Sequence, residues 1–225
     1  MSFGEPVVFV VDDDVSVRES LELLVESACW QAETFGSGQE FLSRPRVAAP
    51  SCLVLDVALP DLSGLDLQSL VADRTDMPII FMSGYGDVAM TVRAMKAGAV
   101  EFLTKPFRPD VMLKAIRDAL ERSTGTLARE AQMLGLRECY ASLSPREREV
   151  MALVVSGRLN KQVGGELGIS EITVKAHRGK LMRKMNAHSL ADLIKMALSL
   201  RVSAPAGPEG RRSQYAARHE QQSPA

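Results

Sequence analysis

The chain has 225 residues, enough for one large domain or two smaller ones, and its formal net charge at pH 7 is −1. Its hydrophobic fraction of 46% and charged fraction of 24% are those of an ordinary soluble protein. No apolar run reaches the length of a membrane span, and the first residues lack the basic and apolar regions of a secretory signal. The three cysteines are too far apart for a metal-ligand pattern, so we expect a cytoplasmic protein with reduced thiols and no membrane partner.

Charge is divided unevenly along the chain. Residues 1–122 contain 11 basic and 19 acidic side chains, and residues 123–225 contain 16 basic and 9 acidic side chains, giving net charges of −8 and +7. An acidic half followed by a basic half indicates two domains with different partners, and the basic half is the candidate for binding nucleic acid. A chance imbalance of solvated surface charge would give the same totals, so sequence motifs are needed to distinguish the two explanations.

The first half alternates short apolar runs with amphipathic segments. Strands are predicted at 7–11, 31–35, 52–57, 78–83 and 100–104, and helices at 16–27, 38–42, 65–74, 87–98 and 109–122. Continuous apolar strands that alternate with helices are typical of a parallel sheet covered on both faces. Five such units predict a doubly wound α/β domain with a five-stranded parallel sheet, which we place at residues 5–122.

The second half has helix signals and no strand signal. Residues 123–141 are predicted to form a polar, helical linker. Ser144, Pro145 and Glu147 then have the spacing of an N-cap, a first-turn proline and a capping box, for a helix that Gly157 ends. Further helices are predicted at 160–168, 171–185 and 190–200. We therefore expect a small all-α, four-helix domain at 142–201 and a disordered tail at 202–225, which is poor in apolar residues.

Acidic, hydroxyl and amino side chains lie at the ends of the predicted strands. Asp12 and Asp13 follow the first strand, Asp56 lies near the end of the third, Ser83 ends the fourth, and Lys105 follows the fifth. Ligands of doubly wound sheets bind at these carboxyl ends. Carboxylates crowded into one cleft destabilise one another unless a cation joins them, and hard oxygen ligands without His or Cys predict Mg²⁺. An acid cluster, a hydroxyl and a lysine around such an ion are typical of phosphoryl transfer. Each residue alone has a simpler explanation, as a helix cap or a solvated side chain.

The segments VVDDD, LVLDVALPDLSGL, IIFMSGYGD and AMKAGAVEFLTKPF resemble the receiver domain of bacterial two-component response regulators, over roughly residues 5–122. The resemblance implies that Asp56 accepts a phosphoryl group from a sensor histidine kinase. It also implies that Mg²⁺ is held by Asp12, Asp13, Asp56 and the backbone carbonyl of Ala58.

The same resemblance implies roles for residues on the later strands. Ser83 and Lys105 would contact the phosphoryl group, and Phe102 takes the position of the family's aromatic switch residue. The peptide bond between Lys105 and Pro106 would be cis. Asp14 would not bind the metal and would instead be a structural acid in the first turn of the following helix, where it is favourable to the helix dipole.

The predicted helix at 171–185 has two distinct faces when it is projected at 100° per residue. One face carries Val174, His177, Leu181 and Met185, and the other carries Ile172, Lys175, Ala176, Gly179, Lys180 and Arg183. A short helix, a glycine turn and a longer helix with a basic outer face predict a helix-turn-helix whose longer helix enters the major groove of DNA. The alternative is an amphipathic surface helix with solvated lysines.

The string LSPREREVMALVVSGRLNKQVGGELGISEITVKAHRGKLMRKM is similar to the LuxR-type DNA-binding domain. A receiver followed by this domain is the architecture of the NarL/FixJ family, and the long interdomain segment resembles its FixJ branch, which includes regulators of aromatic-hydrocarbon catabolism. Carried over by position, the resemblance implies DNA-binding roles for Asn160, Lys161, Thr173, Lys175, Ala176, Arg178 and Gly179. The basic outer face of the helix adds Lys180 and Arg183 to the predicted DNA-binding residues. Within this set, Lys175, Ala176 and Gly179 would line the base-reading face, while His177 is expected to be packed and not to bind a metal.

One departure from the family pattern lies in the short helix before the recognition helix. Gly164 and Gly165 stand where the family usually has at least one alanine. Two glycines inside a helix cost roughly 1–2 kcal/mol of helix preference, so this helix is expected to be soft.

The leading hypothesis is a response regulator in which phosphorylation at Asp56 switches sequence-specific DNA binding and activates transcription. Its partners would be a sensor histidine kinase, double-stranded promoter DNA, RNA polymerase and a second copy of the chain on phosphorylation, and it would have no catalytic residues of its own. One alternative makes the receiver a phosphorylation-independent interaction module. Another is a Mg²⁺-dependent phosphatase with an aspartyl-phosphate intermediate, whose D-x-D-x-T/V pattern would use Asp12, Asp14 and Ser16 and fails at the last position.

Overall fold

In the computed structural model, residues 3–84 and 88–202 are described. The chain divides into two compact units, Met1–Glu130 and Ala131–Ala225, each of which is described below by itself. The part of the expected tail at 203–225 lies outside the described residues. None of the helices in the described segments has the length and apolar character needed to cross a membrane.

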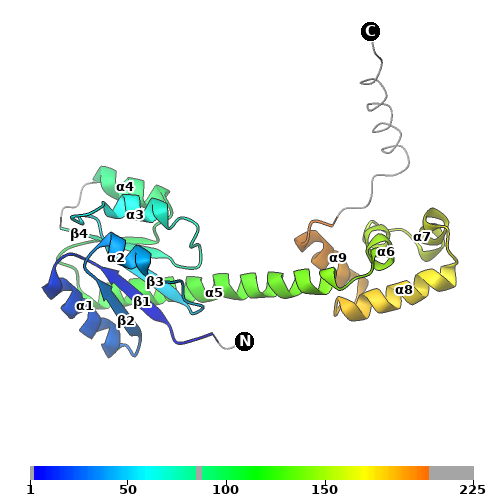
Figure 1. Ribbon diagram of the computed structural model, residues 1–225, viewed down its shortest axis with the longest axis horizontal. Helices are drawn as coiled ribbons and strands as arrows, with labels where there is room; N and C mark the ends of the chain where they lie inside the picture. The colour runs from blue at the N-terminus through cyan, green and yellow to red at the C-terminus, as the bar shows by residue number, and fades with distance from the viewer. Residues whose placement is uncertain (1–2, 85–87, 203–225) are drawn as a thin grey trace, which may run out of the picture. The chain divides into compact units, whose positions relative to one another are not determined.

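The first unit is built on a five-stranded sheet with the strand order β2-β1-β3-β4-β5, and every pair of neighbouring strands is parallel (Figure 1). The strands are β1 (Val7–Val11), β2 (Gln31–Phe35), β3 (Ser51–Asp56), β4 (Ile79–Ser83) and β5 (Glu101–Thr104). Strands β1, β3 and β4 are buried at every residue, which explains their continuous apolar sequences. All five predicted strands are present, with ends that differ from the prediction by at most about one residue.

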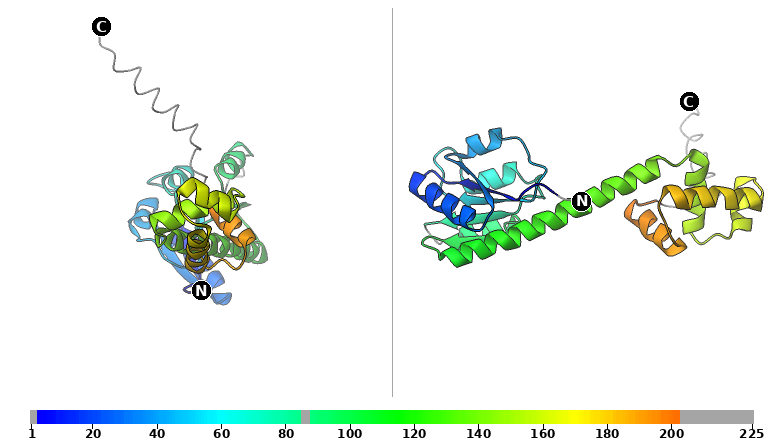
Figure 2. Two further views of the ribbon diagram at one scale, coloured as in Figure 1. Left: turned by 90° about the vertical axis from the view of Figure 1, so that its right-hand side faces the viewer. Right: turned by 90° about the horizontal axis from the view of Figure 1, so that it is seen from below.

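Helices cover both faces of the sheet (Figures 1 and 2). One hydrophobic cluster joins β1 and β3 to α1 (Val15–Ser27) and α5 (Pro109–Ala141), and it includes Val10, Leu21 and Ile116. The cluster on the other face includes Phe9 and Phe41 and involves α2 (Gly38–Ser43), α3 (Gly64–Leu70) and α4 (Val88–Lys96). The predicted doubly wound α/β fold is therefore confirmed.

Helix α5 is longer than expected. We predicted a helix at 109–122 followed by a polar, helical linker at 123–141, and in the structure α5 runs through both segments as one helix of 33 residues. Ser123 is fully buried in the first unit, where its hydroxyl accepts a hydrogen bond from the Ser51 amide (2.9 Å) and donates one to the Asp76 carbonyl (2.5 Å). At the other end, Leu136 and Tyr140 pack against the core of the second unit. Each end of the supposed linker is thus part of a packed unit.

The second unit is an all-α domain that begins within the last part of α5. It contains α6 (Pro145–Val155), α7 (Asn160–Leu167), α8 (Glu171–Lys184) and α9 (Leu190–Ser199). The predicted capping box is present, since the Ser144 hydroxyl accepts from the Glu147 amide and the Glu147 carboxylate accepts from the Ser144 amide. Apolar side chains from all four helices form one core, with Val150, Leu181 and Leu193 among them. The predicted four-helix domain is confirmed.

The two glycines of α7 have different surroundings. Gly164 is buried, and a Cβ atom built there would lie 2.7 Å from the carbonyl oxygen of Ile169, so the absence of a side chain lets the turn before α8 pass close to α7. Gly165 is exposed, and a Cβ atom there would meet nothing within 4 Å. The expected softness of α7 stays a prediction; Gly164 has a packing role, whereas no neighbouring atom requires a glycine at position 165.

Candidate functional site

The candidate site of the first unit lies at the carboxyl edge of the sheet. The strand order reverses around β1, because β2 lies on one side of it and β3 on the other. In doubly wound folds such a reversal opens a crevice at the carboxyl ends of the strands. Asp12 follows β1, Asp56 ends β3 and Lys105 follows β5, so residues far apart in the sequence meet at this edge.

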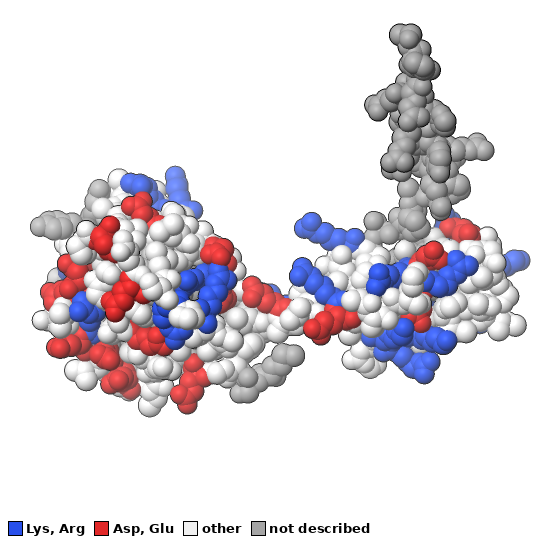
Figure 3. All heavy atoms as spheres, viewed as in Figure 1, with Lys and Arg blue, Asp and Glu red and all other residues white. Residues whose placement is uncertain are grey.

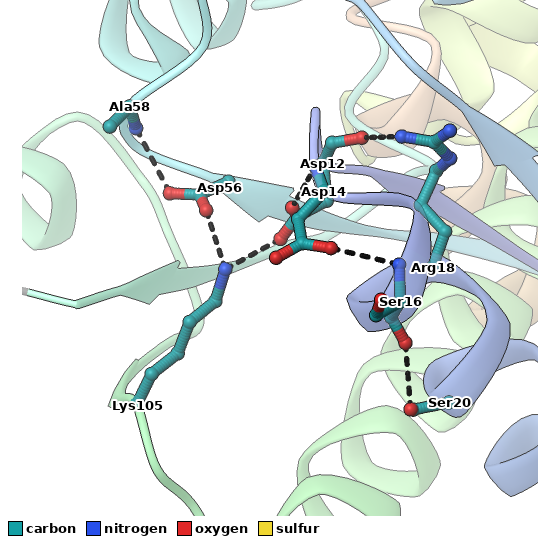
Figure 4. A network of polar contacts seen from close by, with 8 residues as sticks. All are labelled: Asp12, Asp14, Ser16, Arg18, Ser20, Asp56, Ala58 and Lys105. Carbon is teal, nitrogen blue, oxygen red and sulfur yellow. Dashed lines mark hydrogen bonds and ion pairs between the residues drawn. The ribbon is translucent and has the colours of Figure 1, made fainter.

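The centre of the site is an ion-pair network around Lys105 (Figure 4). Its Nζ atom lies 2.6 Å from Oδ2 of Asp12 and 2.5 Å from Oδ2 of Asp56. The side chains of Asp12, Asp56 and Lys105 are 0%, 10% and 23% exposed, respectively. The ammonium group therefore compensates the repulsion between two nearly buried carboxylates. Without such a cation, acids could not lie this close together at the end of a buried strand.

Burial and hydrogen bonding act in opposite directions on these groups. Burial raises the pKa of Asp12, and the hydrogen bonds from Lys105 and from the Asp14 amide (3.0 Å) only partly oppose this. Burial alone would lower the pKa of Lys105, but its hydrogen bonds to Asp12 and Asp56 outweigh burial and raise that pKa. Lys105 is therefore a permanent cation at neutral pH.

Three carboxylates are arranged so that they could share a cation. One oxygen from each of Asp12, Asp13 and Asp56 can be chosen so that all three lie within 4.8 Å of one another, and Asp13 is exposed while the other two are buried. The donors are all hard carboxylate oxygens, which fits Mg²⁺. The amide of Ala58 donates to Oδ1 of Asp56 (3.0 Å), which holds the backbone after β3 beside this carboxylate.

The third acid of the run has a different role. Asp14 is the N-cap of α1, and its side chain accepts a hydrogen bond from the Ser16 amide (2.8 Å). We predicted Asp14 in the first turn of this helix, but it lies one position earlier and its structural role is that of the N-cap. The phosphatase pattern would need this carboxylate for chemistry, whereas here it satisfies the start of a helix.

Arg18 supports the site and was missed in the sequence. Its guanidinium Nη1 donates to the backbone carbonyl of Asp12 (2.5 Å) and so fixes the turn between β1 and α1 (Figure 4). The only signal was an arginine in the first helical turns after the acid run, which is usually a solvated residue.

The remaining predicted site residues lie on β4 and β5. Ser83 is buried at the end of β4, and its carbonyl accepts from the Lys105 amide (2.7 Å), so the two strand ends are joined. The Lys105–Pro106 peptide bond is cis, as the resemblance implied. Phe102 is half-buried on β5, with its ring centroid 6.2 Å from that of Phe81 on β4.

A glycine that sequence reasoning treated only as part of a turn also shapes the site. The Gly64 amide donates to the Val57 carbonyl (2.9 Å), and a Cβ atom at Gly64 would collide with the carbonyl oxygen of Asp56. The start of α3 can therefore lie directly against the backbone of the central carboxylate only because this residue has no side chain.

The candidate nucleic-acid interface is the exposed face of α8. Val174 and Leu181 are buried on its inner side, while Lys175, Ala176, Gly179, Lys180 and Arg183 are exposed. Lys161 of α7 and Thr173 are exposed as well, and His177 is half-buried. Figure 3 shows that Lys and Arg side chains outnumber acidic ones on the visible face of this unit, while acidic side chains are spread over the first.

Some basic residues of the second unit are held by neighbouring side chains. The carboxamide oxygen of Asn160 accepts from Nη1 of Arg178 (3.2 Å), which orients this arginine between α7 and α8. Lys175 forms an exposed ion pair with Glu171 (3.2 Å). Lys184 does not face outward with the others: its Nζ binds the buried Glu147 carboxylate (2.7 Å) of α6.

Comparison with known proteins gives consistent matches for both units. The model of the response regulator receiver domain matches residues 8–117, and that of the luxR family of bacterial regulatory proteins matches residues 141–197. The chain is 50% identical over 199 residues to nodulation protein W of Bradyrhizobium diazoefficiens, covering 88% of each chain. It is 45% identical over 204 residues to the response regulator protein TodT of Pseudomonas putida, covering 90% of each. The solved structure of the response regulator StyR matches with a TM-score of 0.77 at 46% identity, covering 86% of this chain and 98% of that one.

Proposed function

Because the chain belongs to the NarL/FixJ family of response regulators, in which a receiver domain is joined to a LuxR-type DNA-binding domain, we propose that phosphorylation of Asp56 controls DNA binding by α8. The observation that supports this most directly is the network in which Lys105 holds Asp12 and Asp56 at the carboxyl edge of the sheet. The phosphoryl donor would be a phosphohistidine of a sensor kinase.

The transfer step needs little from the protein beyond positioning and charge. An oxygen of the Asp56 carboxylate forms a bond to phosphorus, the bond between phosphorus and the donor's imidazole nitrogen breaks, and the imidazole keeps the electron pair. Negative charge then gathers on the phosphoryl oxygens beside Asp56. Lys105 already bonds this carboxylate, so its ammonium lies where it can turn to those oxygens, and Ser83 at the neighbouring strand end would contact another.

Asp12, Asp13, Asp56 and the backbone carbonyl of Ala58 would hold Mg²⁺. When bound, this ion supplies positive charge that neutralises the phosphoryl oxygens. Asp12 is buried and paired with Lys105, while Asp13 is exposed and can bind without losing such a partner. Arg18 and Asp14 would keep the acid turn in place without touching the phosphoryl group.

The switch would run through β4 and β5. The Ser83 carbonyl accepts a hydrogen bond from the Lys105 amide, and the ring of Phe102 on β5 packs toward that of Phe81 on β4. A shift of Ser83 toward the phosphoryl group would therefore alter the packing of Phe102 and bias the receiver between two arrangements. The phosphorylated receiver would form a homodimer whose paired α8 helices read half-sites about one or two helical turns apart.

In the DNA complex, α8 would lie in the major groove with Lys175, Ala176 and Gly179 at the base edges. Lys180, Arg183, Lys161 and Thr173 would contact the phosphate backbone, and Asn160 would position Arg178 for the same purpose. Phosphate contacts would supply most of the affinity and make it fall with salt. Bound to promoter DNA in the cytoplasm, the dimer would recruit RNA polymerase and activate transcription.

The test is the substitution Asp56→Asn in the full chain, treated with a small-molecule phosphodonor and Mg²⁺. We expect no phosphorylated form on a phosphate-affinity gel and no phosphodonor-stimulated DNA binding. Asp118→Asn, which neutralises an exposed carboxylate on α5, is the control and should behave like the wild type. Full stimulation of DNA binding in Asp56→Asn would refute the mechanism and favour a phosphorylation-independent receiver.

A further inference from the structure

Ile172 is the most exposed large apolar side chain among the described residues, with 80% of its surface accessible. It is the second residue of α8, whose N-cap is Ser170. A β-branched side chain gains little from being in a helix, and at this exposure it contributes almost nothing to the core. Single exposed apolar residues are common on protein surfaces, so a functional role for Ile172 has to be argued from its position on the surface.

That place is the centre of the exposed face of α8. At 100° per residue, Ile172 points away from the buried Val174 and Leu181 and lies on the same side as Ala176 and Gly179. Neither of these two neighbours has a side chain long enough to cover it, and a Cβ atom at Gly179 would meet nothing within 4 Å. A partner that reaches this face would therefore meet the isoleucine directly.

The charges around Ile172 identify the partner. Lys175, Lys180 and Arg183 flank the face, and Glu171 pairs with Lys175. Cations beside a small apolar centre complement duplex DNA, whose phosphates border a groove that exposes base edges. A hydrophobic protein groove would match the isoleucine but would offer no counterions to Lys180 and Arg183.

We infer that Ile172 contacts the 5-methyl group of thymine in the major groove and thereby selects thymine at one position of each half-site. This inference rests on the proposed binding of DNA by α8. Residues in the first turn of a recognition helix contact base edges, and among the four bases only thymine presents a methyl group there. Isoleucine has no hydrogen-bonding group to offer the other bases. Cytosine, which has no methyl group on its fifth carbon, would leave a gap between the isoleucine side chain and the base.

The experiment is a selection from random double-stranded DNA with the full chain, with and without a small-molecule phosphodonor, followed by binding titrations at fixed salt. We expect the wild type to select a thymine that Ile172→Ala no longer selects, while the other preferred positions stay the same. Replacing that thymidine by deoxyuridine removes only the methyl group. It should weaken wild-type binding about fourfold and leave Ile172→Ala nearly unaffected.

Two further variants separate this role from others. Leu23→Ala removes a 69% exposed leucine from α1 in the first unit and should leave the selected sequence unchanged. Lys180→Ala should weaken binding to all sequences evenly, as loss of a phosphate contact does. The inference is overturned if no deoxyuridine weakens wild-type binding, or if deoxyuridine weakens Ile172→Ala as much as the wild type. A wild type that selects no sequence at all overturns the proposed DNA-binding function together with it.

Discussion

Removing the hydroxyl of Ser123 should destabilise the first unit although this residue lies far from the acidic site. Ser123 is fully buried in α5, and its hydroxyl bonds the amide of Ser51 at the start of β3 and the carbonyl of Asp76 before β4. Ser51 is itself only 2% exposed, so its amide cannot turn to bulk water once its acceptor is gone. The substitution Ser123→Ala therefore leaves a buried donor without a partner.

The magnitude follows from that donor. A buried polar group left unsatisfied costs about 1–3 kcal/mol, and the Asp76 carbonyl is only part-buried and can take up water. We therefore expect a loss of about 2 kcal/mol in the free energy of unfolding, most of it from the Ser51 amide. The small change in side-chain volume adds little.

Trp30 makes the measurement specific to this unit. It is the only tryptophan of the chain, and it packs against the cluster that joins the sheet to α1 and α5. Urea titration followed by tryptophan fluorescence should show a lower midpoint for Ser123→Ala with an unchanged slope. The control Ser20→Ala removes an exposed hydroxyl that donates only to a carbonyl of its own helix. A change below about 0.5 kcal/mol in Ser123→Ala would refute the reasoning, because it is the size expected for an ordinary surface substitution.

Three further predictions concern the acid run and the second unit. Asp13→Asn should abolish Mg²⁺-dependent phosphorylation, whereas Asp14→Asn, which keeps a capping side chain, should leave phosphate-affinity gels unchanged. Gly165→Ala should stabilise the second unit by about 1 kcal/mol, whereas Gly164→Ala should not. The stability of the second unit is measured from the far-UV circular dichroism transition, compared with the fluorescence transition of the first unit. Equal stabilisation by the two substitutions would contradict the prediction. Hydrogen bonds from its lysine partner and from a backbone amide lower the pKa of Glu147 below its ordinary 4.5. The stabilisation from Glu147 is therefore complete above pH 4.5 and is lost as the pH falls toward the lowered pKa, so Glu147→Gln should flatten the acid side of the dichroism profile.

Several parts of the fold follow from local sequence because their causes lie within a few residues. Apolar runs mark the strands, and the capping box of Ser144 marks the start of α6. The acidic site was also predictable, since parallel strands end at one edge and therefore bring Asp12 and Asp56 together. The strings around these residues were enough to indicate the family.

The extent of α5 shows where local signals stop. Its middle is polar and contains Gly125 and Gly135, which is typical of a linker, and no predicted cap marks where it ends. The two ends of this continuous helix pack on two different cores, through Ser123 in one unit and Tyr140 in the other. Tertiary packing here outweighs helix preference.

The partners of charged groups were likewise decided by the tertiary structure. Lys105 bonds Asp12 across 93 positions of the chain, and Lys184 at the end of α8 pairs with a buried carboxylate on α6. Gly164 and Gly165 read alike in sequence, yet only the first meets another backbone segment. Periodicity and caps are set by neighbours along the chain and can be read from it, whereas burial and charge pairing depend on residues that only the folded chain brings together.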